Sequence, residues 1–408
     1  MENLFITFLF CYLGLYAGFV LIISIALARV SLPRESQYFP SVTVVVAARN
    51  EENTIARCVE SLLSIDYPSN KLEIVIVDHN SQDNTFDILT NYNRNYPNLR
   101  VFRVAEQSAK LSGKALAVAH GIEQSNGEII FLTDADCEVP PTWVRSITSY
   151  FNSGIDAIGG FASIKTNNES PLHEGAQCVD WLFLQSAAAG IAALGRPLTW
   201  MGNNLAFRRS AYEAVGGFKR LGFSLTEDFT LLKALYKKNR KSVRFILNPA
   251  SKVATRAVTT ISDIYRQRLR WAVGGQSVHP LGKLFIFFGA AIHLLAFPTV
   301  FILLYNPAFI FVWLCLFISD FLFLRYTALK LGQRISLKQF FCFELLFNFY
   351  SVLVALTVPF IRHIKWKNIT YSVSPKILKS NKNNSASHPQ YGIKSETQQK
   401  QFSMSDAQ

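Results

Sequence analysis

The stretch from residue 128 to residue 139, EIIFLTDADCEV, is an apolar, β-branched run that stops at two carboxylates. A short run of this composition, bounded by polar residues, predicts a buried strand. Asp134 and Asp136 follow it one residue apart, and in an extended chain two such side chains point the same way. Like charges on one face repel, so either water solvates them or a cation lies between them. The spacing alone does not choose, because D-x-D arises by chance about once in a chain of this length.

Three earlier stretches are also short, apolar runs, and they alternate with segments of helical character. Each is nearly continuous in β-branched residues, as in a parallel sheet covered on both faces. The alternation predicts a doubly wound α/β fold, in which ligands bind at the carboxyl ends of the strands. The predicted strands are 41–48, 72–78, 99–105 and 128–134, and the predicted helices are 54–65, 82–92 and 113–124.

Polar side chains follow three of these strands. Asp78 ends the second strand, where it can accept a hydrogen bond from a base N–H or a ribose hydroxyl. Asn80 and Ser81 come next. They either belong to the same ligand site or cap the following helix, and the sequence favours the two explanations about equally. Asp134 and Asp136 offer the hard oxygens that Mg²⁺ or Mn²⁺ prefers, together with a substrate diphosphate.

Charged residues also begin two predicted helices. Lys114 lies at a helix start, which is a ready anion site, although a solvated surface lysine is the simpler explanation of this residue alone. Glu227 and Asp228 follow Thr226 at the start of another helix. They either complement the helix dipole or provide a general base for an acceptor hydroxyl.

A further helix is predicted at residues 260–273, where Thr260 and Asp263 resemble a capping box. It is amphipathic and precedes an apolar segment, so it can lie in a membrane interface. The pattern formed by Gln267, Arg270 and Trp271 is less easily explained by anchoring. Q-x-x-R-W arises by chance in roughly one chain in fifty.

Half of the 408 residues are hydrophobic and the formal net charge is +13. Many basic residues lie beside apolar runs, which suits the anionic inner face of a bilayer and not a nucleic-acid surface. The six cysteines show no CxxC spacing, so we expect reduced thiols and no zinc site. The acids Asp320 and Glu344 fall inside apolar runs, where they either pack against other helices or serve a substrate.

The predicted organisation has four parts. Residues 1–30 form an N-terminal transmembrane helix, because the uncharged run is too long and lacks the basic start of a signal peptide. Residues 40–280 form the central α/β domain and end in the helix at 260–273. Residues 283–362 form a membrane region of about three helices, from the apolar runs 284–304, 308–324 and 339–361, and residues 375–408 form a disordered polar tail.

Taken in order, these motifs resemble those of membrane-bound family 2 glycosyltransferases, which include cellulose, chitin and hyaluronan synthases and ceramide glucosyltransferases. The resemblance covers residues 40–280 and rests on AARNEE, VDHNSQD, GKALA, DAD, TED and QRLRW. It implies a GT-A fold, in which a mostly parallel, Rossmann-like nucleotide-sugar domain is flanked by transmembrane helices. One departure is His79, which stands where the family often has a second acid and which puts the choice of nucleotide in doubt.

The resemblance also implies roles for individual residues. Asp228 would be the catalytic base, and Asp134 and Asp136 would hold Mg²⁺ or Mn²⁺. The nucleotide sugar would contact Ala48, Glu51, Asp78, Lys114, Asp134 and Arg270. The acceptor side and its gate would be formed by Glu227, Gln267, Arg270, Trp271, Gly202, Asn203 and Asn204.

The implied reaction is an inverting, metal-dependent transfer from a UDP- or GDP-sugar to a membrane-associated acceptor, with a lipid preferred over a glycan. A processive polysaccharide synthase is the alternative enzyme, although four spans are few for a channel. An inactive nucleotide-sugar-binding scaffold is the alternative from another class. The expected location is the inner, plasma membrane with a cytoplasmic catalytic domain. The side of the C-terminus stays open, because four spans place it outside whereas the basic RHIKWK favours inside.

Overall fold

The structure is a computed structural model of the 408-residue chain. It describes residues 2–30, 39–104, 111, 113–151, 154–166, 170–197, 199–222, 224, 226–275, 291–292, 294–295, 299–302, 306–366, 369–372 and 393–394.

A seven-stranded sheet with the order β3-β2-β1-β4-β7-β5-β8 forms the centre of the α/β domain. Strands β3, β2, β1 and β4 are parallel, whereas β7 is antiparallel to both of its neighbours. The register aligns the carboxyl ends, since Ala48 pairs with Asp78 and Ala47 with Asp134. The strands are β1 Val42–Ala48, β2 Leu72–His79, β3 Leu99–Val104, β4 Ile129–Asp134, β5 Ala157–Gly159, β7 Leu205–Arg208 and β8 Val243–Phe245.

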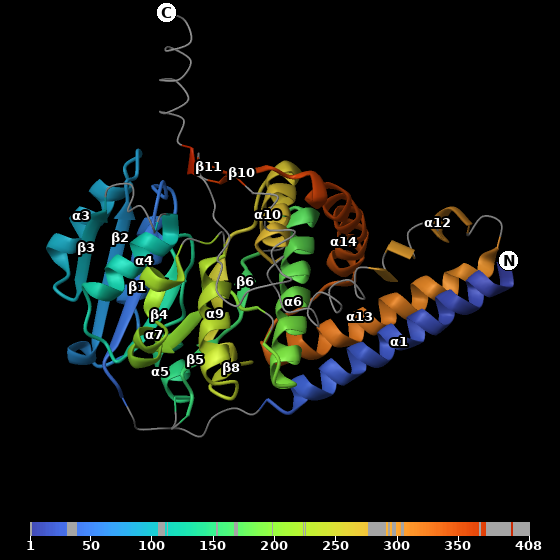
Figure 1. Cartoon of the computed structure of the whole chain (residues 1–408), viewed down its shortest axis with the longest axis horizontal. Coiled ribbons are helices and arrows are strands. Elements are labelled where there is room, and N and C mark those ends of the chain that lie inside the picture. The colour runs from blue at the N-terminus through green and yellow to red at the C-terminus, as the bar shows by residue number, and fades with distance from the viewer. Residues whose placement is uncertain are drawn as a thin grey trace, which may run out of the picture.

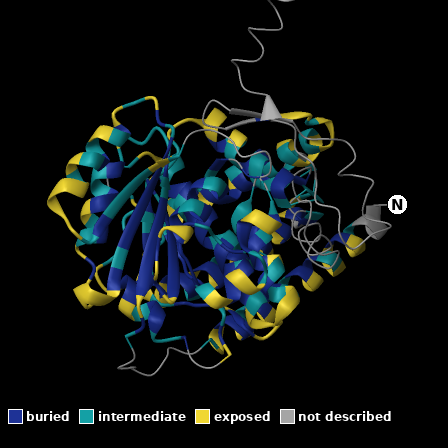
Figure 2. Ribbon diagram, turned by 60° about the vertical axis from the view of Figure 1, so that its left-hand side comes forward, coloured by how far each residue is buried: buried dark blue, intermediate teal, exposed yellow. Residues whose placement is uncertain are grey.

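Helices cover both faces of this sheet, and its central strands are buried (Figure 2). Val44 and Ile76 face the side of α2 (Ile55–Leu63), α3 (Thr85–Asn95) and α5 (Trp143–Thr148). Val45 and Val77 face α4 (Gly113–Glu123), which packs so closely that a Cβ on Gly121 would lie 2.5 Å from Val45 Cγ1. The doubly wound arrangement predicted from the alternating strands and helices is therefore present.

The remaining elements complete the α/β domain and its C-terminal extension. A separate parallel pair is formed by β6 and β9, and β10, β11 and β12 form a small antiparallel sheet. Their bounds, with those of the other helices, are β6 Ala162–Ile164, β9 Val253–Thr255, β10 His363–Trp366, β11 Ile369–Ser372, β12 Ile393–Lys394, α6 Leu172–Ala193, α7 Arg209–Ala214, α8 Gly217–Leu221, α9 Glu227–Lys238, α10 Ile261–Gly274 and α12 Thr299–Ile302.

Three described helices are long and apolar enough to cross a membrane: α1 (Glu2–Ala28), α13 (Ile310–Lys330) and α14 (Leu337–Thr357). Figure 1 shows α6 between the sheet and these helices. The contact between α1 and α6 is close, because a Cβ on Gly190 of α6 would lie 1.8 Å from Ile23 Cγ2 of α1. Most of the predicted apolar stretch 284–304, and all of the tail 375–408 except residues 393–394, lie outside the described residues.

The two acids in the apolar runs face the helix bundle. Asp320 and Glu344 are fully buried, and Tyr16 of α1 donates a hydrogen bond from Oη to Asp320 Oδ1 at 2.6 Å. Carboxyl groups are costly in lipid and persist where neighbouring helices cover them. Asp320 and Glu344 therefore pack inside the membrane region and not on its lipid surface.

Candidate active site

A cavity of about 700 Å³ lies at the carboxyl ends of β1, β2 and β4, beside α6, α9 and α10. All but two of the residues predicted for the site line it, and the exceptions are Asp78 and Asn204. The predicted residues that line the cavity are Ala48, Glu51, Lys114, Asp134, Asp136, Gly202, Asn203, Glu227, Asp228, Gln267, Arg270 and Trp271.

One part of the cavity, termed here the carboxylate side, consists of Lys114, Asp134, Asp136, Glu227 and Asp228. Lys114 Nζ lies 2.5 Å from Asp134 Oδ1 and 3.2 Å from Glu227 Oε1. Burial opposes the charge on Lys114, but the neighbouring carboxylates outweigh it and raise the pKa of this lysine. Lys114 therefore joins the end of β4 to the start of α9 as a permanent cation.

The acids that follow β4 fit a divalent cation. Ligand atoms of Asp134, Asp136 and Cys137 lie within 4.8 Å of one another. Burial raises the pKa of Cys137 well above its usual value, and Asp136 and Asp134 raise it further. The two carboxylates offer hard oxygen donors, which are the ligand type of Mg²⁺ or Mn²⁺.

Asp228 lies in the first turn of α9, where Thr226 is the N-cap. Burial raises the pKa of Asp228 to about 6, Glu227 adds to the increase, and Lys114 opposes it. Gly202 faces this carboxylate so closely that a Cβ there would lie 3.0 Å from Asp228 Oδ2. Asp228 is thus a carboxylate with a pKa near neutrality, which suits a general base.

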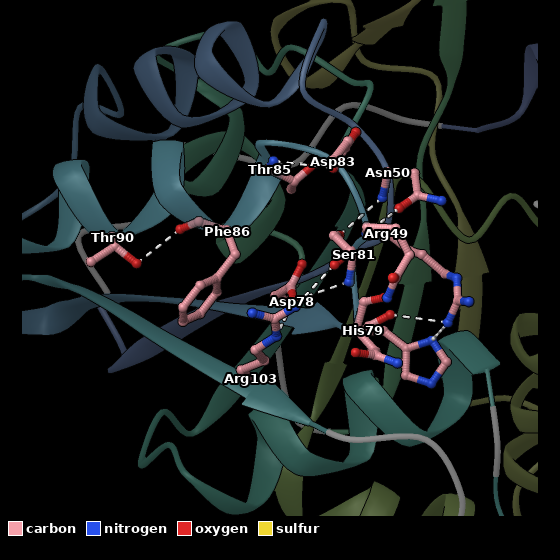
Figure 3. Close-up of polar contacts among 12 residues, drawn as sticks. Arg49, Asn50, Asp78, His79, Ser81, Asp83, Thr85, Phe86, Thr90 and Arg103 are labelled. Carbon is pink, nitrogen blue, oxygen red and sulfur yellow. Dashed lines mark hydrogen bonds and ion pairs between the residues drawn. The ribbon is translucent and has the colours of Figure 1, made fainter.

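Asp78 is fully buried and does not line the cavity. Its Oδ2 lies 3.2 Å from Arg103 Nε and accepts a hydrogen bond from the Ser81 N–H at 3.2 Å (Figure 3). Arg103 in turn stacks on the Phe86 ring at 4.6 Å. Asp78 therefore orders the turn after β2, at the edge of the cavity.

His79, the next residue, does line the cavity, because consecutive strand residues point to opposite faces. Arg49 Nη1 lies 3.3 Å from His79 Nδ1 and donates to the His79 carbonyl at 3.1 Å (Figure 3). Because a guanidinium can only donate, a hydrogen bond at this contact has Nδ1 as its acceptor. Where the resemblance predicts a second acid, this chain thus has an imidazole ring in contact with Arg49.

The loops after β1 and β2 hold each other. Asn50 and Asn80 both have a φ of 52°, a left-handed conformation that asparagine tolerates. The Asn50 N–H donates to Ser81 Oγ at 3.0 Å, and Asn50 Oδ1 accepts from the Gln82 N–H at 2.9 Å. The N-cap of α3 is Asn84, so the alternative that Asn80 and Ser81 cap this helix is wrong.

Asn204 lies in the protein core. Its Oδ1 accepts from Trp143 Nε1 at 2.9 Å, and its Nδ2 donates to the carbonyls of Phe161 at 2.7 Å and Ser251 at 2.8 Å. The whole amide is thus engaged in joining the start of α5, the residue before β6 and the turn Pro249–Ser251. Asn204 is a structural residue behind the cavity, whereas the preceding Asn203 lines it.

Another part of the cavity lining, termed here the apolar wall, consists of Trp181, Leu184, Ala187 and Ile191 of α6 and Trp271 of α10. The rings of Trp181 and Trp271 meet edge to face at 5.6 Å. Sequence reasoning missed the α6 residues. The sequence feature that could have identified them is the weakly charged 22-residue run LHEGAQCVDWLFLQSAAAGIAA. This run is too polar for a membrane span and too apolar for a surface helix.

Helix α10 brings Gln267, Arg270 and Trp271 to the cavity. Thr260 is the N-cap, since its Oγ1 accepts from the Asp263 N–H at 3.1 Å. The Asp263 carboxylate accepts from Thr260 Oγ1 at 2.7 Å instead of from the Thr260 backbone N–H, so the predicted capping box is only half formed. The opposite face of the helix is mostly buried, although Ile261 at its start is 69% exposed. The helix thus presents its Q-x-x-R-W residues to the cavity.

Comparison with known proteins agrees with this geometry. Residues 43–216 match the family described as glycosyl transferase family 2. A β-monoglucosyldiacylglycerol synthase from Synechocystis is 34% identical over 243 residues, which are 58% of this chain and 48% of that protein. A poly-β-1,6-N-acetyl-D-glucosamine synthase from Staphylococcus epidermidis is 26% identical over 259 residues, 60% of this chain and 57% of that protein.

The chain spans about half the length of the curated relatives it matches. The similarity to a solved structure is wider. A mannosyltransferase from Pyrobaculum calidifontis, in complex with GDP-Man and Mn²⁺, superposes with a TM-score of 0.57 at 19% identity, over 88% of this chain and 97% of that chain. Residues 43–216 therefore match glycosyl transferase family 2, and the central sheet shares the GT-A fold of this mannosyltransferase.

Proposed function

We propose that this protein transfers a hexose from a nucleotide sugar to a lipid acceptor at a membrane, with inversion of the anomeric carbon. The observation that carries the proposal is the single cavity that joins acids at strand ends, a carboxylate with a pKa of about 6 and an apolar wall. The similarity to a glucosyldiacylglycerol synthase and to a mannosyltransferase solved with GDP-Man supports it.

The donor would lie across the ends of β1, β2 and β4. Asp134 and Asp136 would hold Mg²⁺ or Mn²⁺, which when bound neutralises charge on the diphosphate. Lys114 and Arg270 reach the same cavity and stabilise negative charge that develops on the leaving group. Ala48, Glu51 and His79 line the end where the nucleoside would bind, with Asp78 behind them.

Asp228 would take the proton from the acceptor hydroxyl as this oxygen attacks the anomeric carbon. Its pKa of about 6 leaves it mostly ionised at neutral pH, yet basic enough to accept a proton. The new glycosidic bond forms as the bond to the diphosphate breaks, so one displacement inverts the carbon. No second nucleophilic carboxylate is required.

The apolar wall favours a lipid acceptor over a sugar. Leu184, Ala187 and Ile191 offer no hydrogen bonds, whereas a glycan site needs many polar partners. The wall also belongs to α6, which packs against the three helices that are long enough to cross a membrane. Because nucleotide sugars are cytosolic, we place the cavity on the cytoplasmic side of the plasma membrane.

The test is a donor screen with the full chain in detergent or nanodiscs. UDP- and GDP-sugars are supplied with Mg²⁺ or Mn²⁺ and diacylglycerol, and products are separated by chromatography. We expect a single glycolipid, whose anomeric configuration by NMR is opposite to that of the donor. A ladder of polymer would instead support a processive synthase, as in the staphylococcal relative.

A further inference from the structure

A buried ionic cluster lies just behind the apolar wall, where α6, α10 and α14 meet. Arg268 Nη2 of α10 pairs with Asp180 Oδ2 of α6, and the two side chains are only 4% and 5% exposed. Tyr350 Oη of α14 donates to the other Asp180 oxygen at 2.7 Å. Asp180 raises the pKa of Arg268 even though burial opposes the charge, so the pair stays ionised.

Arg268 does not line the cavity, but it contacts two residues that do. Its Nη1 donates to Gln267 Oε1 at 2.9 Å, and its guanidinium carbon lies 4.4 Å from the Trp271 ring centre. Trp271 also contacts the ring of Trp181, the residue after Asp180, edge to face at 5.6 Å. One guanidinium thus touches both a polar and an aromatic residue of the cavity.

The arrangement is costly if its purpose is stability alone. Removing two charges from water is expensive, and well-packed apolar residues often stabilise such a position equally well. A planar guanidinium is, in contrast, well suited to stacking on a ring while donating in fixed directions. The chemistry of the cluster therefore indicates geometric control of Gln267 and Trp271.

We propose that Arg268 is a positioning residue, fixed by Asp180 and Tyr350, that sets the orientation of Gln267 and Trp271 in the cavity. Through Tyr350, the membrane helix α14 becomes part of the support of the acceptor side. The proposal rests on the proposed transfer function for its kinetic consequence, although not for its structural one.

The variant that tests it is Arg268→Lys, which keeps a cation opposite Asp180 but loses the planar stack and the bond to Gln267. We expect an unchanged melting temperature, a donor KM within about twofold, and a kcat about 10²-fold lower, as for misplaced catalytic groups. The matched control is Arg266→Lys on the same helix. Arg266 is 67% exposed, pairs with Asp263 at 3.4 Å, and should tolerate the change.

A second readout needs no turnover. The difference in fluorescence between each protein and its Trp271→Phe derivative isolates Trp271, and acrylamide quenching then reports its accessibility. Arg268→Lys should increase that quenching, and Tyr350→Phe, which removes one hydrogen bond, should change it less in the same direction. Wild-type kcat together with unchanged quenching in Arg268→Lys would overturn the proposal.

The two readouts separate the possible failures. A wild-type protein that transfers no sugar refutes the proposed function, while the quenching comparison still decides on positioning. If Arg268→Lys does not fold, Tyr350→Phe decides: unchanged kcat and quenching refute the proposal, and a decrease in kcat at constant melting temperature supports it.

Discussion

The molecule contains two cation–carboxylate clusters that differ in their access to the cavity. Lys114 joins Asp134 and Glu227 on the carboxylate side, where these three side chains are 19%, 36% and 14% exposed. Arg268 and Asp180 form a sealed pair behind the apolar wall. The first cluster, termed here the open cluster, reaches the cavity, so a ligand can replace one of its ion-pair partners. The second, termed here the sealed cluster, has no such access. Under our proposals, the first cluster therefore serves the transfer reaction and the second fixes the orientation of Gln267 and Trp271.

The change expected to affect the open cluster most is Asp228→Asn. An amide cannot take the acceptor proton, so kcat should fall by about 10³-fold, while the affinity for the nucleotide changes little. Steady-state kinetics and calorimetric titration of the nucleotide measure the two quantities. Asp66→Asn, at a 68% exposed carboxylate, is the control. Full activity of Asp228→Asn would remove Asp228 from the mechanism.

Asp136→Asn tests the second carboxylate of the same cluster. We expect activity to require Mg²⁺ or Mn²⁺, and the Mn²⁺ concentration for half-maximal activity to increase about 10- to 100-fold in the variant. Glu138→Gln is the matched control, since Glu138 follows two residues later and pairs with Lys165 instead. Equal metal requirements in both variants would contradict a role for Asp136 as a ligand.

Gly202→Ala tests how tightly the base is held. The new Cβ would lie 3.0 Å from Asp228 Oδ2, so the carboxylate must move by a few tenths of an ångström. We expect kcat about tenfold lower, equivalent to about 1.4 kcal/mol in the activation barrier. Gly18→Ala, where a Cβ meets open space, should leave kcat unchanged. A Gly202→Ala enzyme with normal kcat would show that the position of this oxygen is not critical.

The smallest effect we expect is on pH dependence. Protonation of Asp228 removes the base, so kcat/KM should decrease as the pH falls through about 6. Lys114 lowers the pKa of Asp228, and Lys114→Met should therefore move this acidic limb to higher pH. A pH profile of kcat/KM for both proteins measures the shift. A limb that stays in place would show that Lys114 does not act on the base.

Sequence alone predicted the first half of the domain closely, since strands β1 to β4 and their helices follow local periodicity. It predicted less where pairing is non-local. Strand β5 has three residues and pairs with β7 and β8, about 50 and 85 residues away. The predicted site residues Asp134, Asp228 and Trp271 do line one cavity. They could be predicted because the order of the motifs along the chain indicates which strand or helix carries each residue.

The sealed cluster could not be predicted in this way. Arg268 pairs with Asp180, which lies 88 positions earlier in the chain. Asp180 also accepts a hydrogen bond from Tyr350, which lies 170 positions after Asp180. No periodicity connects such positions, and Arg268 looks in sequence like one more arginine of an amphipathic helix. Sequence alone also did not predict that His79, and not Asp78, lines the cavity. Consecutive residues of a strand point to opposite faces, and the sequence does not say which face borders the cavity.

The contact between Gly190 and Ile23 bears on whether this protein is modular. A glycine at this crossing lets the backbone of α6 approach the side chains of α1, and the same α6 supplies most of the apolar wall. Helix α1 thus packs directly against α6, the helix that forms most of the apolar wall, and is not joined to the domain by the chain alone. We therefore expect that replacing α1 with another membrane helix will require this crossing to be rebuilt.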